Sequence, residues 1–294
     1  MDRPIMIGVI GGSGLYKMTG VDVVEEIQLR TPFGSPSDAI VIGEIEGTAV
    51  AFLPRHGRGH VHSPSEVPYR ANIYAMKMLG VQALISVSAC GSLREDFRPG
   101  DIVVPDQVLD FTKLRQSSFF GEGWVAHVSV ADPFCPVLSA ALASAVSRAG
   151  GTVHAGGAFI TIEGPRFSTK AESRVYRAWG MDIIGMTASP EVFLAREAGM
   201  CYATMAHVTD YDVWHETEEP VTVEMVIQQL NANLDVAQEA IRLLVRAWDS
   251  ADRGGCACAR ALETALITHP EHIAPQAKDR LALLTEAFIH PKAD

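Results

Sequence analysis

Met6-Ile7-Gly8-Val9-Ile10-Gly11-Gly12-Ser13-Gly14 is the stretch from which the fold can be worked out. Residues 6–10 are a short apolar run, which predicts a buried strand. The glycines that follow predict a tight turn with exposed backbone amides, and such amides can hold a phosphate because glycine allows close approach. The stretch lacks the G-x-G-x-x-G spacing of a dinucleotide site and the Gly-Lys-Ser/Thr of a P-loop. A plain tight turn is therefore the alternative to an anion-binding loop.

Similar β-branched runs bounded by glycine recur through the first two thirds of the chain. One long amphipathic helix is predicted from Val223 to Val245, with Thr222 as its N-cap. We expect a single α/β domain over residues 1–250, and residues 251–294 as a helical extension packed on it and broken at His269-Pro270. Further strands are predicted at 39–42, 48–53, 83–87, 102–104, 158–162 and 202–208, and further helices at 67–78, 136–149 and 169–179.

The composition excludes several classes of protein. The 294 residues include 24 basic and 35 acidic side chains, which give a formal net charge of −11. Nucleic acids and anionic membranes are bound by clustered Lys and Arg, so we expect neither as a partner. No stretch approaches the ~20 apolar residues of a membrane helix, and the first apolar run is too short for a secretory signal, so we expect a cytoplasmic protein.

Five cysteines are an odd and sparse set, unlike the dense framework of a small secreted domain. Cys256 and Cys258 are the only close pair in the sequence. We expect them to be reduced thiols, because a redox or metal role needs partners that the sequence does not identify.

Arg55-His56-Gly57-Arg58-Gly59-His60-Val61-His62 follows the predicted strand at 48–53. Its three histidines allow a metal site, but no acidic ligand lies nearby to complete a hydrolytic one, so we expect no metal. An arginine beside a histidine at a strand end suits an oxyanion such as phosphate, which a guanidinium binds with two hydrogen bonds. Val87-Ser88-Ala89-Cys90-Gly91-Ser92 closes another strand and can add a hydroxyl and an amide to the same anion, although a packed turn is the alternative.

Thr209-Asp210-Tyr211-Asp212 places two carboxylates after the predicted strand at 202–208. Residues two apart lie on the same side of an extended segment. These acids are either turn residues that cap the next helix or acceptors for a purine. Adenine would suit them, because it offers an exocyclic amine and, when protonated, an N7–H donor.

Together these segments stand in the order and spacing of a known family. The sequence resembles the trimeric purine nucleoside phosphorylase family and, within it, the S-methyl-5'-thioadenosine phosphorylase branch, over roughly residues 5–245. Besides the segments above, the resemblance is carried by Thr31-Pro32-Phe33-Gly34, Leu93-Arg94, Pro99-Gly100-Asp101-Ile102-Val103, Thr161-Ile162-Glu163-Gly164-Pro165-Arg166-Phe167-Ser168 and Met186-Thr187.

The resemblance implies a central mixed β-sheet flanked by helices, and reversible phosphorolysis. Inorganic phosphate would attack C1' of 5'-methylthioadenosine and release adenine and 5-methylthioribose 1-phosphate. No metal or organic cofactor, nucleic acid or membrane partner is implied; phosphate is a co-substrate, and the assembly would be a homotrimer.

The resemblance also implies a role for individual residues. Asp210 would carry a proton so that adenine leaves neutral, which requires a carboxyl whose pKa is raised by burial and by repulsion from Asp212. Asp212, Asp210 and Ser13 would be the catalytic residues. The phosphate site would be Ser13, Arg55, His56, Ser88, Ala89 and Thr187; the purine and ribose would meet Phe167, Met186, Asp210 and Asp212; the 5'-methylthio group would meet Val223, Val226, Ile227 and His127 of the partner subunit.

Two departures from the family pattern bear on these roles. Ser13 and Ser88 stand where threonine is common, which keeps the hydroxyl. Gly185 stands where some relatives have asparagine, which affects how the purine is held. Three alternatives stay open: phosphorolysis of a 6-oxopurine nucleoside or 5'-methylthioinosine, a nucleoside-binding protein without turnover, and a hydrolase. Asp212 favours adenine, because its carboxylate would face the carbonyl oxygen of a 6-oxopurine.

Overall fold

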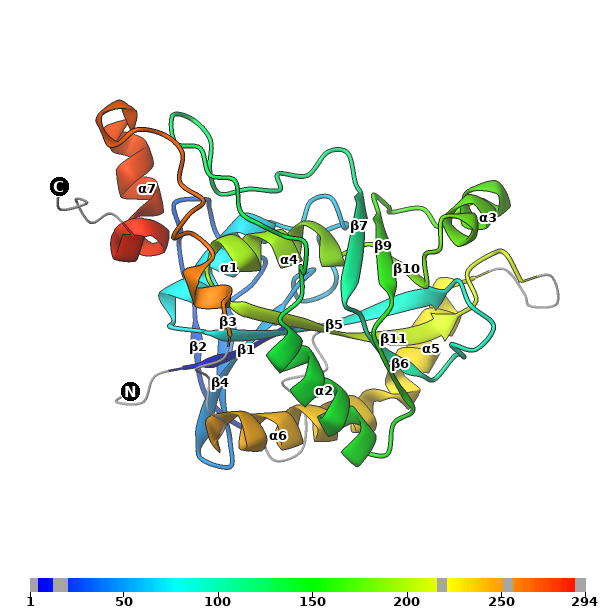
Figure 1. Cartoon of the computed structure of the whole chain (residues 1–294). Helices are drawn as coiled ribbons and strands as arrows, with labels where there is room; N and C mark the ends of the chain where they lie inside the picture. The colour runs from blue at the N-terminus through cyan, green and yellow to red at the C-terminus, as the bar shows by residue number, and fades with distance from the viewer. Residues whose placement is uncertain (1–4, 13–20, 216–220, 251–255, 289–294) are drawn as a thin grey trace.

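One mixed β-sheet organises the molecule. The computed structural model describes residues 5–12, 21–215, 221–250 and 256–288, and this part of the chain contains an eleven-stranded sheet (Figure 1). The strands are β1 (Ile7–Gly11), β2 (Asp22–Ile27), β3 (Ile40–Ile45), β4 (Thr48–Pro54), β5 (Ala83–Ser92), β6 (Ile102–Val104), β7 (Gln107–Phe111), β8 (Val153–Ala155), β9 (Ala158–Ile162), β10 (Ile183–Gly185) and β11 (Cys201–Asp210).

The strand order is β2-β3-β4-β1-β5-β10-β9-β7, and β11 branches from β5 to pair with β6, which also pairs with β8. At the centre, β1 is parallel to both β4 and β5, and β11 is parallel to β5. The carboxyl ends of these four strands therefore lie at one edge of the sheet, where ligands bind in open α/β sheets. Because β10 runs antiparallel to β5, the loop after β10 begins beside that strand.

Helices cover both faces of the sheet, which is why the central strands are apolar along their whole length. In Figure 1, α1 and α4 lie above the sheet and α2 and α6 below it. Alternate residues of β4 divide between the two cores: Ala51 and Leu53 pack with α1 and α4, whereas Val50 and Phe52 pack with α2 and α6. The helices are α1 (Tyr69–Met78), α2 (Pro136–Arg148), α3 (Lys170–Ala178), α4 (Ala188–Glu197), α5 (Val223–Ala232), α6 (Leu234–Ser250) and α7 (Pro275–Thr285).

The predicted fold class is confirmed, and every predicted strand is present. Five elements were not predicted from the sequence: β2, β7, β8, β10 and α4. β2 is an exposed, acidic edge strand, and β8 and β10 have only three residues each, so none carries a long apolar run. Prediction of one helix from Val223 to Val245 was wrong: it divides at Asn233, whose side-chain amide donates to the Gly100 carbonyl (3.0 Å).

The described tail, residues 256–288, packs against the α1 and α4 face. Ala277, Leu281 and Leu284 of α7 belong to the same apolar cluster as Ile73 and Val192. A single α-helix follows His269-Pro270, and three short 3₁₀ turns (Cys258–Arg260, Pro270–His272 and Glu286–Phe288) make up the other helical turns. Among the described residues, no helix combines the length and apolarity needed to cross a membrane.

Candidate active site

The predicted site residues come from loops that leave neighbouring strand ends. Gly11 of β1 pairs with Pro54 of β4, and the next amide, that of Arg55, donates to the Gly11 carbonyl (2.9 Å). On the other side, Asp210 at the end of β11 pairs with Gly91 of β5. The motifs predicted to bind an anion and the acidic pair therefore share one edge of one sheet.

Gly91 makes this convergence possible. It lies between β11 and β10, since it pairs with both Asp210 and Ile184. A Cβ atom at position 91 would lie 2.9 Å from Asp210 Oδ1 and 3.1 Å from Ile184 Cγ2. Only glycine allows the Asp210 carboxylate to lie this close to β5.

Arg55 is held by a buried ion pair. Its Nε and Nη2 atoms each donate to a different oxygen of Glu191 at 2.9 Å, and both side chains are almost wholly buried. Nη1 donates to the Val87 carbonyl (3.0 Å) and Nη2 also to Ser86 Oγ (2.6 Å). Burial alone would lower the pKa of Arg55, but the Glu191 carboxylate outweighs burial, so the pKa is raised and the guanidinium stays charged.

This arrangement changes what Arg55 can offer an anion. We expected the guanidinium to bind phosphate with two hydrogen bonds, but its Nε–Nη2 side donates to Glu191. Of the five guanidinium hydrogens, only one, on Nη1, is not used in the contacts described. Glu191, together with Tyr202 whose hydroxyl donates to it at 2.8 Å, was missed from the sequence. No local pattern points to a pair that joins residues 136 positions apart.

His56 is neutral in this environment. Burial, with Arg55 close by, lowers its pKa to about 4. Nδ1 lies 2.9 Å from the His62 carbonyl, which can only accept, so the neutral ring carries its proton on Nδ1. Its Nε2 atom is therefore an acceptor, available to a hydroxyl such as that of a protonated phosphate.

The remaining residues predicted to bind phosphate lie on β5 and after β10. Ser88 Oγ is buried without a hydrogen-bond partner in the described part of the chain. Thr187 is buried directly after β10, and the carbonyl of Ala89 would lie 3.3 Å from a Cβ on Gly185, so the two segments are adjacent. Ser13 lies outside the described residues.

Asp210 is buried at the end of β11. Thr209 Oγ1 donates to its Oδ2 (2.6 Å), and the Asp212 amide donates to its Oδ1 (2.8 Å). The pKa of Asp210 is raised to about 6, mainly by burial and also by the charge of Asp212, although the two hydrogen bonds oppose this rise. The raised pKa that the sequence analysis expected is confirmed, with burial as its main cause.

Asp212 is held in the left-handed region (φ 51°), and its Cβ would lie 3.3 Å from a Cβ placed on Gly91 of β5. Burial raises its pKa, although the nearby hydroxyls of Ser173 and Ser168 lower it. Asp212 Oδ2 and Ser168 Oγ are buried and make no hydrogen bond to described residues. A purine amine would satisfy such an oxygen.

Arg115 connects the loops around the site, and its role was not predicted from the sequence. It donates to the carbonyls of Met186 (2.6 Å), Ser189 (2.7 Å) and Glu163 (2.7 Å). It also forms an ion pair with the Glu163 side chain (3.2 Å). Its partners are 46 to 74 residues away in the chain, so no spacing in the sequence could identify it. Met186 is thus positioned through its backbone, while Phe167 is 39% exposed.

Four predicted residues lie on exposed or partly exposed surface, although α5, which carries three of them, packs beside β11 (Figure 1). Val223 and Ile227 on α5 are 58% and 53% exposed, and Val226 is partly exposed. His127 is exposed on a different loop, where its backbone amide donates to the Ala265 carbonyl (2.9 Å). These residues form open surface in a single chain.

Comparison with known proteins gives consistent matches. The phosphorylase superfamily matches residues 6–246. An S-methyl-5'-thioadenosine phosphorylase from Chloroflexus aurantiacus is 57% identical over 277 residues, which cover 94% of this chain and 96% of that protein. A solved methylthioadenosine phosphorylase from an Antarctic soil metagenomic library has a TM-score of 0.91 at 50% identity, with 96% of this chain and 99% of that chain covered. A methylthioadenosine phosphorylase from Schistosoma mansoni, solved in complex with adenine, has a TM-score of 0.81 at 41% identity, with 84% and 93% covered.

Proposed function

Because the chain belongs to the phosphorylase superfamily and, within it, to the S-methyl-5'-thioadenosine phosphorylases, we propose that it cleaves 5'-methylthioadenosine with inorganic phosphate. The products are adenine and 5-methylthioribose 1-phosphate. The reaction needs no metal or organic cofactor in this scheme, since phosphate is the nucleophile and a side chain supplies the proton.

The observation that carries the proposal is the shared strand β5. Arg55 contacts it at Val87, and Asp210 pairs with it at Gly91. Four residues of strand span roughly 13 Å, which is enough room for a nucleoside with a phosphate at its C1'. The sheet thus offers a cationic end and an acidic end to one ligand.

At the cationic end, the groups that can bind phosphate directly are Ser88 Oγ, the Thr187 hydroxyl and His56 Nε2. The buried hydroxyl of Ser88 has no other described partner, and a hydrogen bond to an anion would satisfy it. His56 Nε2 would accept the phosphate's own proton. Arg55 would contribute its remaining Nη1 hydrogen and its positive charge. We also assign the Ala89 amide to the phosphate site, together with Ser13, which lies outside the described residues.

At the acidic end, Asp210 acts as the general acid. A phosphate oxygen bonds to C1' while the C1'–N9 bond breaks and its electron pair passes to the base. The Asp210 proton moves to N7, so adenine leaves neutral and Asp210 is left as a carboxylate. Its pKa of about 6 lies close to neutral pH, which suits a general acid.

Asp212 determines the base in this proposal. Its Oδ2 can accept from the adenine amine, but would face the oxygen of hypoxanthine without a proton to share. Asp212→Asn should therefore lower kcat/KM for 5'-methylthioadenosine and raise it for 5'-methylthioinosine, a reversal of preference measured by comparing both substrates. Equal losses on both would contradict this role for Asp212.

We propose that a homotrimer completes the 5'-methylthio pocket. The exposed Val223 and Ile227 would gain cover, and the exposed His127 would serve a neighbouring site. Activity per chain should then fall when the protein is diluted to monomers, as followed by sedimentation and initial rates at the same concentrations.

The reaction itself is tested by product analysis. With 5'-methylthioadenosine and phosphate we expect adenine and 5-methylthioribose 1-phosphate in equal amounts, and no cleavage in phosphate-free buffer. Free methylthioribose without phosphate would establish a hydrolase, and binding of both substrates without product would establish a nucleoside-binding protein. Faster cleavage of inosine or 5'-methylthioinosine than of 5'-methylthioadenosine would overturn the choice of base.

A further inference from the structure

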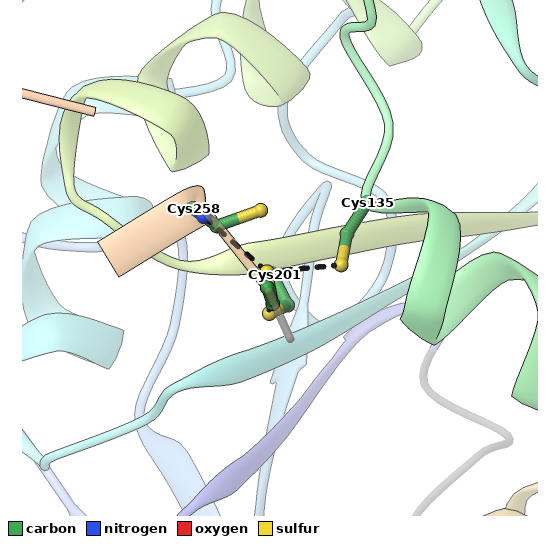
Figure 2. Close-up of side chains that lie close together, drawn as sticks. Cys135, Cys201 and Cys258 are labelled. Atoms are coloured by element: carbon green, nitrogen blue, oxygen red, sulfur yellow. Dashed lines mark hydrogen bonds between the residues drawn. The ribbon is translucent and has the colours of Figure 1, made fainter. Parts of the chain in front are cut away.

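Four of the five cysteines lie close together at the amino end of β11. The loops of the candidate active site follow the opposite, carboxyl ends of the central strands. Cys135 precedes α2, Cys201 is the first residue of β11, and Cys258 begins a 3₁₀ turn of the tail (Figure 2). Cys256 lies two residues earlier in the tail. All four sulfur atoms lie within 4.8 Å of one another. The tail pair therefore has the partners that the sequence alone did not identify.

The spacing of the sulfur atoms is closer to that of metal ligands than to that of a disulfide. Cys256 Sγ lies 3.5 Å from Cys135 Sγ and 3.3 Å from Cys201 Sγ, and all the cysteines are free thiols. A disulfide requires about 2.05 Å between sulfur atoms. A tetrahedral zinc site with Zn–S bonds of about 2.3 Å requires sulfur atoms about 3.8 Å apart. We propose that Cys135, Cys201, Cys256 and Cys258 bind one Zn²⁺ ion.

The surroundings favour thiolates at this point. Arg196 Nη1 donates to Cys258 Sγ (3.3 Å), and the Cys258 amide donates to Cys256 Sγ (3.3 Å). Cys135 is the N-cap of α2, where the partial positive charge of the helix end stabilises an anion. Each thiol that binds the metal releases one proton, and four thiolates with Zn²⁺ leave a charge of −2 that these donors offset.

The site is structural, because four protein ligands fill a tetrahedral zinc and leave no position for a substrate. Its ligands come from the start of a helix, the start of a central strand and the tail, so the metal would fasten the tail to the sheet. Further along the tail, Ala265 accepts from the His127 amide and Ile267 donates to the Val125 carbonyl. The zinc would thereby hold the loop that carries His127, independently of the proposed reaction.

The test begins with metal analysis of the full-length protein purified without chelators. We expect one Zn²⁺ per chain by elemental analysis, and thiols that become reactive toward a thiol reagent only when the zinc is extracted. Protein prepared with Co²⁺ should show the ligand-field bands of tetrahedral thiolate coordination. Cys258→Ser and Cys256→Ser should each lose most of the zinc and lower Tm by roughly 5 °C or more.

Cys90→Ala is the matched control, because Cys90 is the fifth cysteine and lies outside the cluster. It should keep its zinc. Wild-type protein with less than a tenth of an equivalent of any metal would overturn the proposal, and so would disulfides among the four cysteines found by mass after alkylation under denaturing conditions. Stoichiometric iron in place of zinc would overturn the choice of metal. The wild-type measurements decide the matter even where a variant fails to fold.

Discussion

The two ends of the site are built differently. At the phosphate end the strongest cation, Arg55, is already bound by Glu191, Ser86 and Val87. At the proposed purine end, Asp212 Oδ2 is buried without a partner among the described residues, and Asp210 accepts hydrogen bonds from Thr209 and the Asp212 amide. The charged group at one end is therefore paired before a ligand arrives, whereas at the other end a charged group has an oxygen that a ligand must satisfy.

This difference indicates which residues should bind the ligand directly and which should support the site from behind it through their existing contacts. A buried charge that is already paired can exert a field on a ligand without changing its own contacts. A buried oxygen without a partner costs free energy until something donates to it. We therefore expect substitutions at the purine end to change catalysis, and substitutions in the Arg55–Glu191 pair to change stability first.

The largest effect is expected at Asp210. Asp210→Asn keeps the shape but cannot deliver a proton, so kcat should fall ~10² to 10⁴-fold while KM changes less. In the wild type the protonated form is lost as pH rises through about 6, so kcat should decline on that side. This decline should be absent in Asp210→Asn. If the variant and the wild type had the same dependence of kcat on pH, the general-acid role of Asp210 would be contradicted.

Stability provides the control for that variant. The pKa of Asp210 is raised in the folded protein, so the folded state binds this proton more tightly than the unfolded chain does. This proton therefore contributes to the free energy of unfolding fully below about pH 4, and the contribution is lost as pH rises through about 6. Asn carries no charge, so Asp210→Asn should have an unchanged or higher Tm at pH 7, and its lost activity cannot then come from unfolding.

Glu191→Gln should have the next largest effect, and on stability. It leaves the buried Arg55 guanidinium without its counter-charge, which typically costs ~3 to 5 kcal/mol. Denaturant unfolding should show the loss directly. Asp96→Asn is the control, since its pair with Arg94 is exposed and such pairs contribute little. Equal stability of Glu191→Gln and wild type would mean that Arg55 is not held as described.

The smallest effect is expected at Ser88. Its substitution tests whether an unpaired hydroxyl at the proposed phosphate end binds the anion without contributing to stability. Ser88→Ala removes a hydroxyl that has no described partner, so unfolding should change little. Losing a hydrogen bond to an anion costs ~1.5 to 3 kcal/mol, so the KM for phosphate should rise roughly 10- to 100-fold. Ser139→Ala on α2, which also removes a buried hydroxyl without a described partner, should leave that KM unchanged.

Sequence patterns predicted most of the sheet because the buried strands carry apolar runs. β1 and β5 are such runs, and the helices α1, α2 and α3 end near the predicted glycines. The exposed β2 and the three-residue β10 have no such signal. The break at Asn233 depends on a bond to Gly100, 133 residues away, and a helical periodicity cannot reveal that contact.

The motifs of the candidate site could be predicted from the sequence, but most of the contacts between its side chains could not. Asp210, Asp212 and the loop at His56 could be identified because they follow strands and carry polar groups. Arg115 and Glu191 could not, because each acts through partners far away in the chain. The same holds for the cysteines: Cys256 and Cys258 are visible as a pair, but Cys135 and Cys201 become their neighbours only in the folded chain.

By itself the sequence determined that apolar strands alternate with helices and that polar motifs follow several of those strands, since periodicity and local chemistry depend on neighbouring residues. Tertiary structure alone decided which of those motifs meet, that Arg55 is bound by Glu191, and that burial raises the pKa of Asp210 to about 6. The physical reason is that burial and charge pairing depend on atoms brought together across more than a hundred residues, and no local pattern encodes that approach.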